Sequence, residues 1–189
     1  MYNQLNDKTD KIDKTDDLVC NWKCYLICSL DSNDTYIGAT NNFVNRLRSH
    51  NSKNTDIKRV GAKRTAGKTW IPCIVISGFT SKNACLSFES NWKRLFRKRS
   101  SLRLTVVNIM TQRNICYSRC TKWNRIVDLL YFFYYFKLLD TKFTMNKNMC
   151  PIIAPPFMKI NIFSETWIKN LPWPYFVSCE ILSNKSELL

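Results

Sequence analysis

The chain has 189 residues, of which 45% are hydrophobic and 13% aromatic, so it can bury a sizeable core and is not a disordered protein. Its formal net charge is +15, and residues 22–130 carry the excess, with twenty Lys and Arg against five Asp and Glu. Such a field favours a polyanion, nucleic acid above all, as partner, with a generally basic surface as the alternative.

The cysteine pattern and the hydropathy of the chain indicate the cellular compartment in which the protein is expected. The nine cysteines include no CxxC pair, so we expect no zinc site, and the first twenty residues contain no apolar signal sequence. Asp128 and Lys137 interrupt the most apolar stretch, 126–140, which is shorter than the roughly 20 residues of a membrane span. We therefore expect an intracellular protein of the nucleus or cytoplasm, not secreted, with no membrane partner.

The first half of the chain reads as a leader followed by a compact unit. Residues 1–21 have no hydrophobic periodicity and are expected to form a flexible leader. "WKCYLICSL" then predicts a strand, "DSND" a turn, and "TYIGA" the returning strand of a hairpin. "TNN" offers caps for a helix over about 42–50, and the polar, basic stretch 51–69 reads as a loop.

The second half of the chain is predicted to begin with a third strand, "WIPCIVISGF", at 70–79. Ser81 is a candidate cap for a helix over 82–97, and further helices are expected near 105–118 and 121–140. The proline-rich tail disfavours long helices, and its aromatic residues are expected to pack on the main body. Residues 22–104 would form the main domain and 105–189 a helical, then irregular, aromatic-rich extension.

Two helices carry polar residues that suggest chemistry. Glu89 shares a helix face with Cys85, Trp92 and Phe96, where a carboxylate needs a cation, a donor or a metal ion. The alternative is a structural glutamate paired with an arginine. His50 is the only histidine of the chain.

Arg46 and His50 lie four positions apart on the other helix, and therefore on one face, whereas Arg48 points away. A guanidinium on this face could stabilise the charge that develops on a phosphate during displacement. Tyr25 and Tyr36, in the two hairpin strands, could orient water beside such a group. The alternative for His50 is a lone surface histidine, and for the tyrosines ordinary core packing.

These residues occur in blocks with a recognisable order. "CYLI", "YIG", "RLRSHN", "GAKRT" and "GFTSKNACLSFESNWK" follow one another over about residues 22–96. The series resembles the GIY-YIG nuclease superfamily, and within it the catalytic subunit of SLX-type structure-specific endonucleases. The resemblance implies an α/β (α+β) fold with a small three-stranded antiparallel sheet flanked by helices.

The resemblance also implies a set of site residues. The catalytic residues would be Tyr25, Tyr36, Arg46, His50 and Glu89, with Glu89 holding one divalent ion, Mg²⁺ or Mn²⁺. Residues expected to contact DNA are Arg48, Lys58, Arg59, Lys63, Arg64, Lys93, Arg94, Arg97 and Lys98.

The chain departs from the family pattern at three places. "KCY" stands for the GIY triplet, and Lys63 occupies a position in "GAKRT" where an aromatic residue is usual. The chain lacks the Cys and His spacing of the family's RING-like C-terminal domain, which binds a scaffold subunit, so the expected protein partner is either a scaffold subunit or a second copy of the chain.

The resulting expectation is a metal-dependent endonuclease that cuts branched or flap DNA in repair or recombination. The alternative is a catalytically inactive nucleic-acid-binding module built on a nuclease fold. The Asn-, Lys- and Ile-rich composition suits an A/T-rich, viral genome, and therefore a virus-infected host cell.

Overall fold

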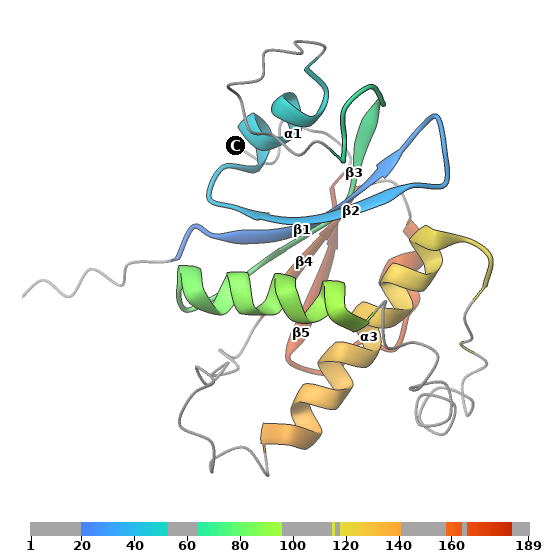
Figure 1. Cartoon of the computed structure of the whole chain (residues 1–189). Helices are drawn as coiled ribbons and strands as arrows, with labels where there is room; N and C mark the ends of the chain where they lie inside the picture. Colours follow the sequence, from blue (N-terminus) through green and yellow to red (C-terminus); the bar gives the residue numbers. More distant parts are fainter. Residues whose placement is uncertain are drawn as a thin grey trace, which may run out of the picture.

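The computed structural model describes residues 20–52, 64–95, 115, 118–140, 158–163 and 166–182. Its centre is a five-stranded sheet with the strand order β2-β1-β3-β4-β5 (Figure 1). The strands are β1 (Lys23–Ser29), β2 (Thr35–Thr40), β3 (Trp70–Ser77), β4 (Met158–Ile162) and β5 (Val177–Ile181). All neighbours pair antiparallel except β4 and β5, which are parallel.

Helices cover the two faces of this sheet. α1 (Phe43–His50) lies on one face, while α3 (Thr121–Asp140) and the helix over residues 82–95, drawn in green, lie on the other (Figure 1). β1 is buried from Cys24 to Cys28 because both of its faces are covered. We refer to the α1 side as the upper face and to the other side as the lower face.

Side chains of β1 divide between these faces with the two-residue period of a strand. Leu26 belongs to a large apolar cluster on the lower face, together with Phe88 of the helix over 82–95. Tyr25 belongs to a smaller cluster on the upper face, where it meets Phe43 and Trp70. The upper face thus combines a thin apolar core with the polar residues singled out from the sequence.

The predicted class and the predicted helix caps are confirmed, but the strand number is wrong. Asn42 accepts a hydrogen bond from the backbone N–H of Asn45 at 3.0 Å, and Ser81 accepts one from Ala84 at 3.1 Å. The sheet has five strands because the C-terminal extension adds β4 and β5 beside β3. The expected helix over 105–118 falls almost entirely outside the described residues.

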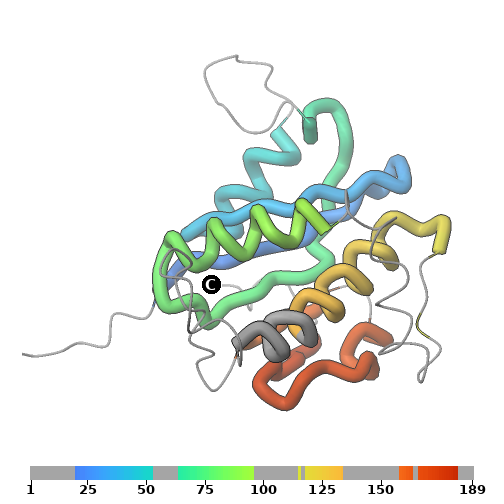
Figure 2. The backbone as a smooth tube through the Cα atoms, turned by 60° about the horizontal axis from the view of Figure 1, so that its bottom comes forward, coloured from blue at the N-terminus to red at the C-terminus, as the bar shows by residue number. Residues whose placement is uncertain are grey.

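The C-terminal extension packs on the core, as its aromatic residues predict. η3 (Thr166–Asn170) lies between β4 and β5, and this segment runs beside α3 in Figure 2. The Phe133 ring of α3 lies 6.1 Å, between centroids, from each of the rings of Trp173 and Phe176. In the described part of the chain, no helix has the length and apolar character needed to cross a membrane.

Candidate active site

Tyr25 lies at the centre of the candidate site, on the upper face of the sheet. Its side chain is fully buried, and its ring centroid lies 5.1 Å from that of Phe43 on α1. Tyr36 projects from the neighbouring strand, with its ring 6.3 Å from that of Tyr25 and 5.0 Å from that of His50. The hairpin therefore brings both predicted tyrosines to the inner side of α1.

Gly38 allows the Tyr25 phenol to lie flat against β2. The two residues are directly opposite each other in the antiparallel register. A β-carbon at position 38 would lie 2.5 Å from Tyr25 Cζ, closer still to the hydroxyl oxygen, and 2.9 Å from Tyr36 Cε1. The glycine of the "YIG" block is therefore needed to make room for the first tyrosine.

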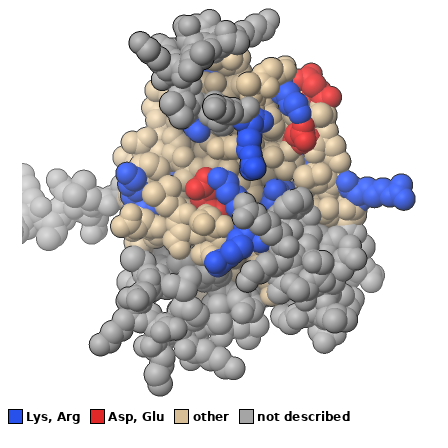
Figure 3. Space-filling view, in the orientation of Figure 1, with Lys and Arg blue, Asp and Glu red and all other residues tan. Residues whose placement is uncertain are grey.

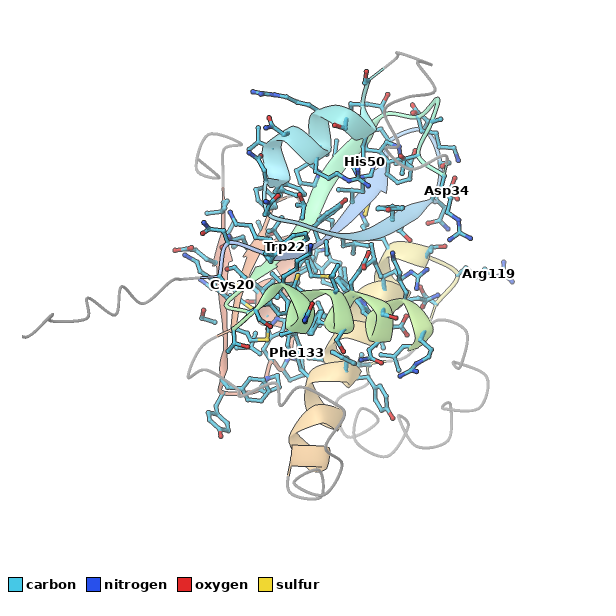
Figure 4. All side chains as sticks on the ribbon, turned by 60° about the vertical axis from the view of Figure 1, so that its left-hand side comes forward. Cys20, Trp22, Asp34, His50, Arg119 and Phe133 are labelled. Atoms are coloured by element: carbon cyan, nitrogen blue, oxygen red, sulfur yellow. The ribbon has the colours of Figure 1, made fainter. Side chains whose placement is uncertain are left out.

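Arg46 and His50 hold the Tyr25 hydroxyl from two sides. Arg46 donates a hydrogen bond from Nε to the hydroxyl oxygen at 3.2 Å, and His50 Nε2 lies 2.8 Å from the same oxygen. His50 is 3% exposed, so it is not a surface histidine, and Figure 4 shows it on α1 next to the strands. Their four-residue spacing places both side chains on one helix face, as the sequence predicts.

The charges of this cluster are set by burial and by Arg46. Burial and, as a smaller cause, the nearby Arg46 charge together lower the pKa of His50 to about 4, so the imidazole is neutral at pH 7. Burial raises the pKa of Tyr25 well above its usual range, against the opposing effect of the Arg46 hydrogen bond and charge. Tyr25 is therefore a protonated phenol and not a phenolate that could already act as a general base.

Arg46 keeps its positive charge despite being partly buried. Burial by itself would lower its pKa, but contacts with the Tyr25 and Tyr36 hydroxyls raise the pKa overall. The guanidinium is half-buried, and its remaining donors can reach an anion at the surface.

Glu89 belongs to the helix over 82–95, on the lower face of the sheet. Its negative charge is among the causes that raise the pKa of Tyr25. Lys93, one turn later, forms a 2.6 Å ion pair with the Glu89 carboxylate and lies 5.5 Å above the centre of the Tyr36 ring. The partner of Glu89 is thus a lysine, not the arginine of the alternative interpretation, and the glutamate side chain is 17% exposed.

The chemistry of Glu89 fits a hard divalent cation. Mg²⁺ in particular is often bound through one or two carboxylates, with water and substrate phosphate oxygens completing its shell. Within the described ranges, no group of three or more His, Cys, Asp or Glu is placed to hold a metal ion. A metal at this position would therefore depend on Glu89 and on oxygen atoms from the substrate and solvent.

Trp70 and Asn51 fasten the end of α1 to the sheet. Asn51 donates to the Trp70 carbonyl at 2.9 Å and accepts from the Trp70 N–H at 2.6 Å. The Trp70 indole donates to the Thr65 carbonyl at 2.8 Å, and the Thr65 hydroxyl lies 2.9 Å from His50 Nδ1. Thr65 is a site residue that the sequence analysis missed, although it stands in the quoted "GAKRT" block.

The predicted DNA-contacting residues are only partly described. Arg48, Arg64 and Arg94 are exposed, whereas Lys93 is occupied by Glu89. Basic side chains lie over both the α1 layer and the layer of the helix over 82–95 on the face shown in Figure 3. Outside the described residues are Lys58, Arg59, Lys63, Arg97 and Lys98.

Tyr25, Arg46, His50 and Glu89 all lie within one segment that matches a known protein family. Residues 21–102 match the GIY-YIG family, described as the GIY-YIG catalytic domain. Residues 21–102 of the chain therefore belong to the GIY-YIG nuclease superfamily, as the order of the motifs predicts.

Several proteins are similar to the chain. The Uncharacterized protein L300 of Acanthamoeba polyphaga mimivirus is 51% identical over 164 residues, which are 86% of this chain and 98% of that protein. The Structure-specific endonuclease subunit SLX1 of Vanderwaltozyma polyspora is 39% identical over 75 residues, or 39% of this chain. That of Eremothecium gossypii is also 39% identical, over 77 residues or 40% of this chain. The matches span 24% and 26% of these two SLX1 proteins.

Proposed function

We propose that the chain is a metal-dependent endonuclease that hydrolyses phosphodiester bonds in branched or flap DNA, in repair or recombination. The observation that carries this proposal is the buried hydrogen-bond series from Arg46 through Tyr25 to His50. Similarity to SLX1 proteins supports the choice of a structure-specific substrate, although the match covers only about a quarter of their length.

Glu89 would hold one Mg²⁺ or Mn²⁺ ion, which supplies charge stabilisation to the scissile phosphate and to its leaving oxygen. Lys93 would leave the carboxylate when that ion enters, because both cations need the same oxygen atoms. Released from Glu89, the Lys93 ammonium becomes available to a DNA phosphate, which is the role expected from the sequence.

Tyr25 would orient the attacking water and pass on its proton. A phenol whose pKa is raised by burial cannot act as a preformed tyrosinate. It can, however, accept a proton from water on its oxygen while it gives its own proton to His50 Nε2, 2.8 Å away. Tyr36 would support the His50 ring from the adjacent strand.

Arg46 would stabilise the negative charge that accumulates on the phosphate during attack. Its Nε fixes Tyr25, so the remaining nitrogen atoms of the guanidinium can point to phosphate oxygens. A bound phosphate would also offset the Arg46 charge that depresses the pKa of His50, and so make His50 a better acceptor. Arg48, Arg64 and Arg94 would contact the DNA backbone beside the cut.

The surroundings of the reaction belong to the same proposal. We infer an intracellular protein of the nucleus or cytoplasm, in a virus-infected host cell. DNA would be its main partner, and a scaffold subunit or a second copy of the chain would complete the assembly.

A nicking assay on labelled 5′-flap, splayed-arm and linear duplex DNA tests the proposal, with Mg²⁺, Mn²⁺ or EDTA. Arg46→Ala removes the guanidinium, and Arg119→Ala is its control, because Arg119 is an exposed arginine outside α1 and outside the predicted DNA-contacting residues. Glu89→Gln removes the carboxylate charge, and Glu180→Gln is its control, because Glu180 is also paired with a lysine, Lys159.

The expected result is metal-dependent cutting near the branch. Arg46→Ala should lower kcat by about 100- to 1,000-fold, the loss typical for one transition-state donor. Glu89→Gln should abolish cutting, while both control variants should keep it. If wild type and variants bind the DNA equally and none cuts it under any of these conditions, the inactive binding module is the correct function.

A further inference from the structure

Thr65 holds the far side of the His50 ring. Its side chain is 1% exposed, and Oγ1 lies 2.9 Å from His50 Nδ1. Its own position is fixed through the backbone, since the Thr65 carbonyl accepts from the Trp70 indole. Both ring nitrogens of His50 thus have a defined neighbour, Tyr25 on one side and Thr65 on the other.

The hydrogen-bond inventory around Tyr25 indicates which nitrogen of His50 carries the proton. Arginine can only donate, so the Tyr25 oxygen is the acceptor in its bond with Arg46 Nε. The hydroxyl proton of this buried tyrosine then needs an acceptor, and His50 Nε2 lies at 2.8 Å from the oxygen. If Nε2 itself carried a proton, the Tyr25 oxygen would face two donors, Arg46 Nε and His50 Nε2.

A neutral imidazole has one N–H group, and with Nε2 as acceptor that group is Nδ1–H. We propose that Thr65 is a positioning residue that fixes this tautomer by accepting the Nδ1–H of His50. Nε2 is thereby kept as the acceptor for the Tyr25 proton. The kinetic part of the inference rests on the proposed nuclease function, whereas the tautomer itself does not.

The single histidine of the chain makes the tautomer directly measurable. In protein labelled with ¹⁵N-histidine, long-range ¹H–¹⁵N correlation spectra distinguish Nδ1–H from Nε2–H without substrate or metal. The variants are Thr65→Val, which removes the hydroxyl at nearly constant shape, and Thr65→Ser, which retains it. Thr69→Val, at an exposed threonine of the same connection, is the control.

Wild type, Thr65→Ser and Thr69→Val should show Nδ1–H at pH 7, and Thr65→Val should show a gain of Nε2–H. In the nicking assay, Thr65→Val should lower kcat by about 10- to 100-fold, as removal of an orienting partner typically does, with unchanged DNA affinity. Thr65→Ser should restore most of the rate.

An Nε2–H tautomer in wild type, or a Thr65→Val variant that keeps Nδ1–H, would overturn the inference. If the wild-type chain does not cut DNA but shows the expected tautomers, the proposed function fails and the role of Thr65 stands. Thermal unfolding shows whether Thr65→Val folds. If it does not, the His50 tautomer measured in wild type and in Thr65→Ser still decides the inference, because both must show Nδ1–H.

Discussion

Replacing Gly38 with alanine tests whether the position of the Tyr25 phenol controls activity. The added β-carbon would lie 2.5 Å from Tyr25 Cζ, whereas carbon atoms in favourable contact are about 3.5–4.0 Å apart. The ring must therefore move by about 1 Å, or β2 must shift away from β1. Either movement lengthens the hydrogen bonds that Tyr25 makes with Arg46 and His50.

We expect two separable effects. Overpacking of the upper face should lower the free energy of unfolding by about 1–3 kcal/mol. Displacement of a catalytic group by about 1 Å should lower kcat by about 100-fold, which is more than the loss of folded protein explains. Urea unfolding gives the first quantity, and single-turnover cleavage of a 5′-flap substrate at saturating enzyme gives the second.

Ile37→Val provides the matched control. Ile37 precedes Gly38 in β2 but packs in the lower cluster, so its truncation destabilises the same strand by about 0.5–1.5 kcal/mol without touching Tyr25. We expect this variant to cut at the wild-type rate. A Gly38→Ala protein as stable and active as wild type would refute the steric argument, and equal rate losses in both variants would refute the catalytic one.

Further predictions concern pH, metal binding and the extension. Because the pKa of His50 is about 4 when folded and 6.5 when unfolded, the unfolded state takes up a proton first as pH falls. The free energy of unfolding, measured with urea, should therefore fall by about 3 kcal/mol between pH 7 and pH 4 because of His50. This contribution should be absent in His50→Phe. Lys93→Met should tighten Mn²⁺ binding at Glu89 by about two- to fivefold in a calorimetric titration, and a weakened affinity would contradict the competition. Removing residues 158–189 exposes the apolar partners of β3 and should lower stability by roughly 5 kcal/mol or more, seen as lost thermal cooperativity.

The proximity of the candidate site residues was largely predictable because these residues lie in local patterns. A hairpin places Tyr25 and Tyr36 on one face through a two-residue period, and one helical turn joins Arg46 to His50. Thr65 could not be predicted from such a pattern. It stands in a polar connection without periodicity, and only the folded Trp70 brings its hydroxyl to the imidazole.

The two additional strands were missed for a different reason. In β4, the buried residues Met158, Ile160 and Ile162 alternate with the more polar Lys159 and Asn161. This alternation is the two-residue period of a strand. The neighbouring prolines favoured the interpretation of this segment as an irregular tail. The partner of Ile74 is Ile162, and no local propensity indicates a pairing across so many residues.

The pairing of β3 with β4 also has a consequence for how the protein is made. Residues 23–77 supply three adjacent strands, and Ile160 and Ile162, which are fully buried in the same core, are synthesised only after them. We expect the early strands to remain incompletely packed on the ribosome until β4 and β5 have emerged, because non-local strand pairs form late. A nascent chain would thus complete its central sheet only after β4 and β5 have been synthesised.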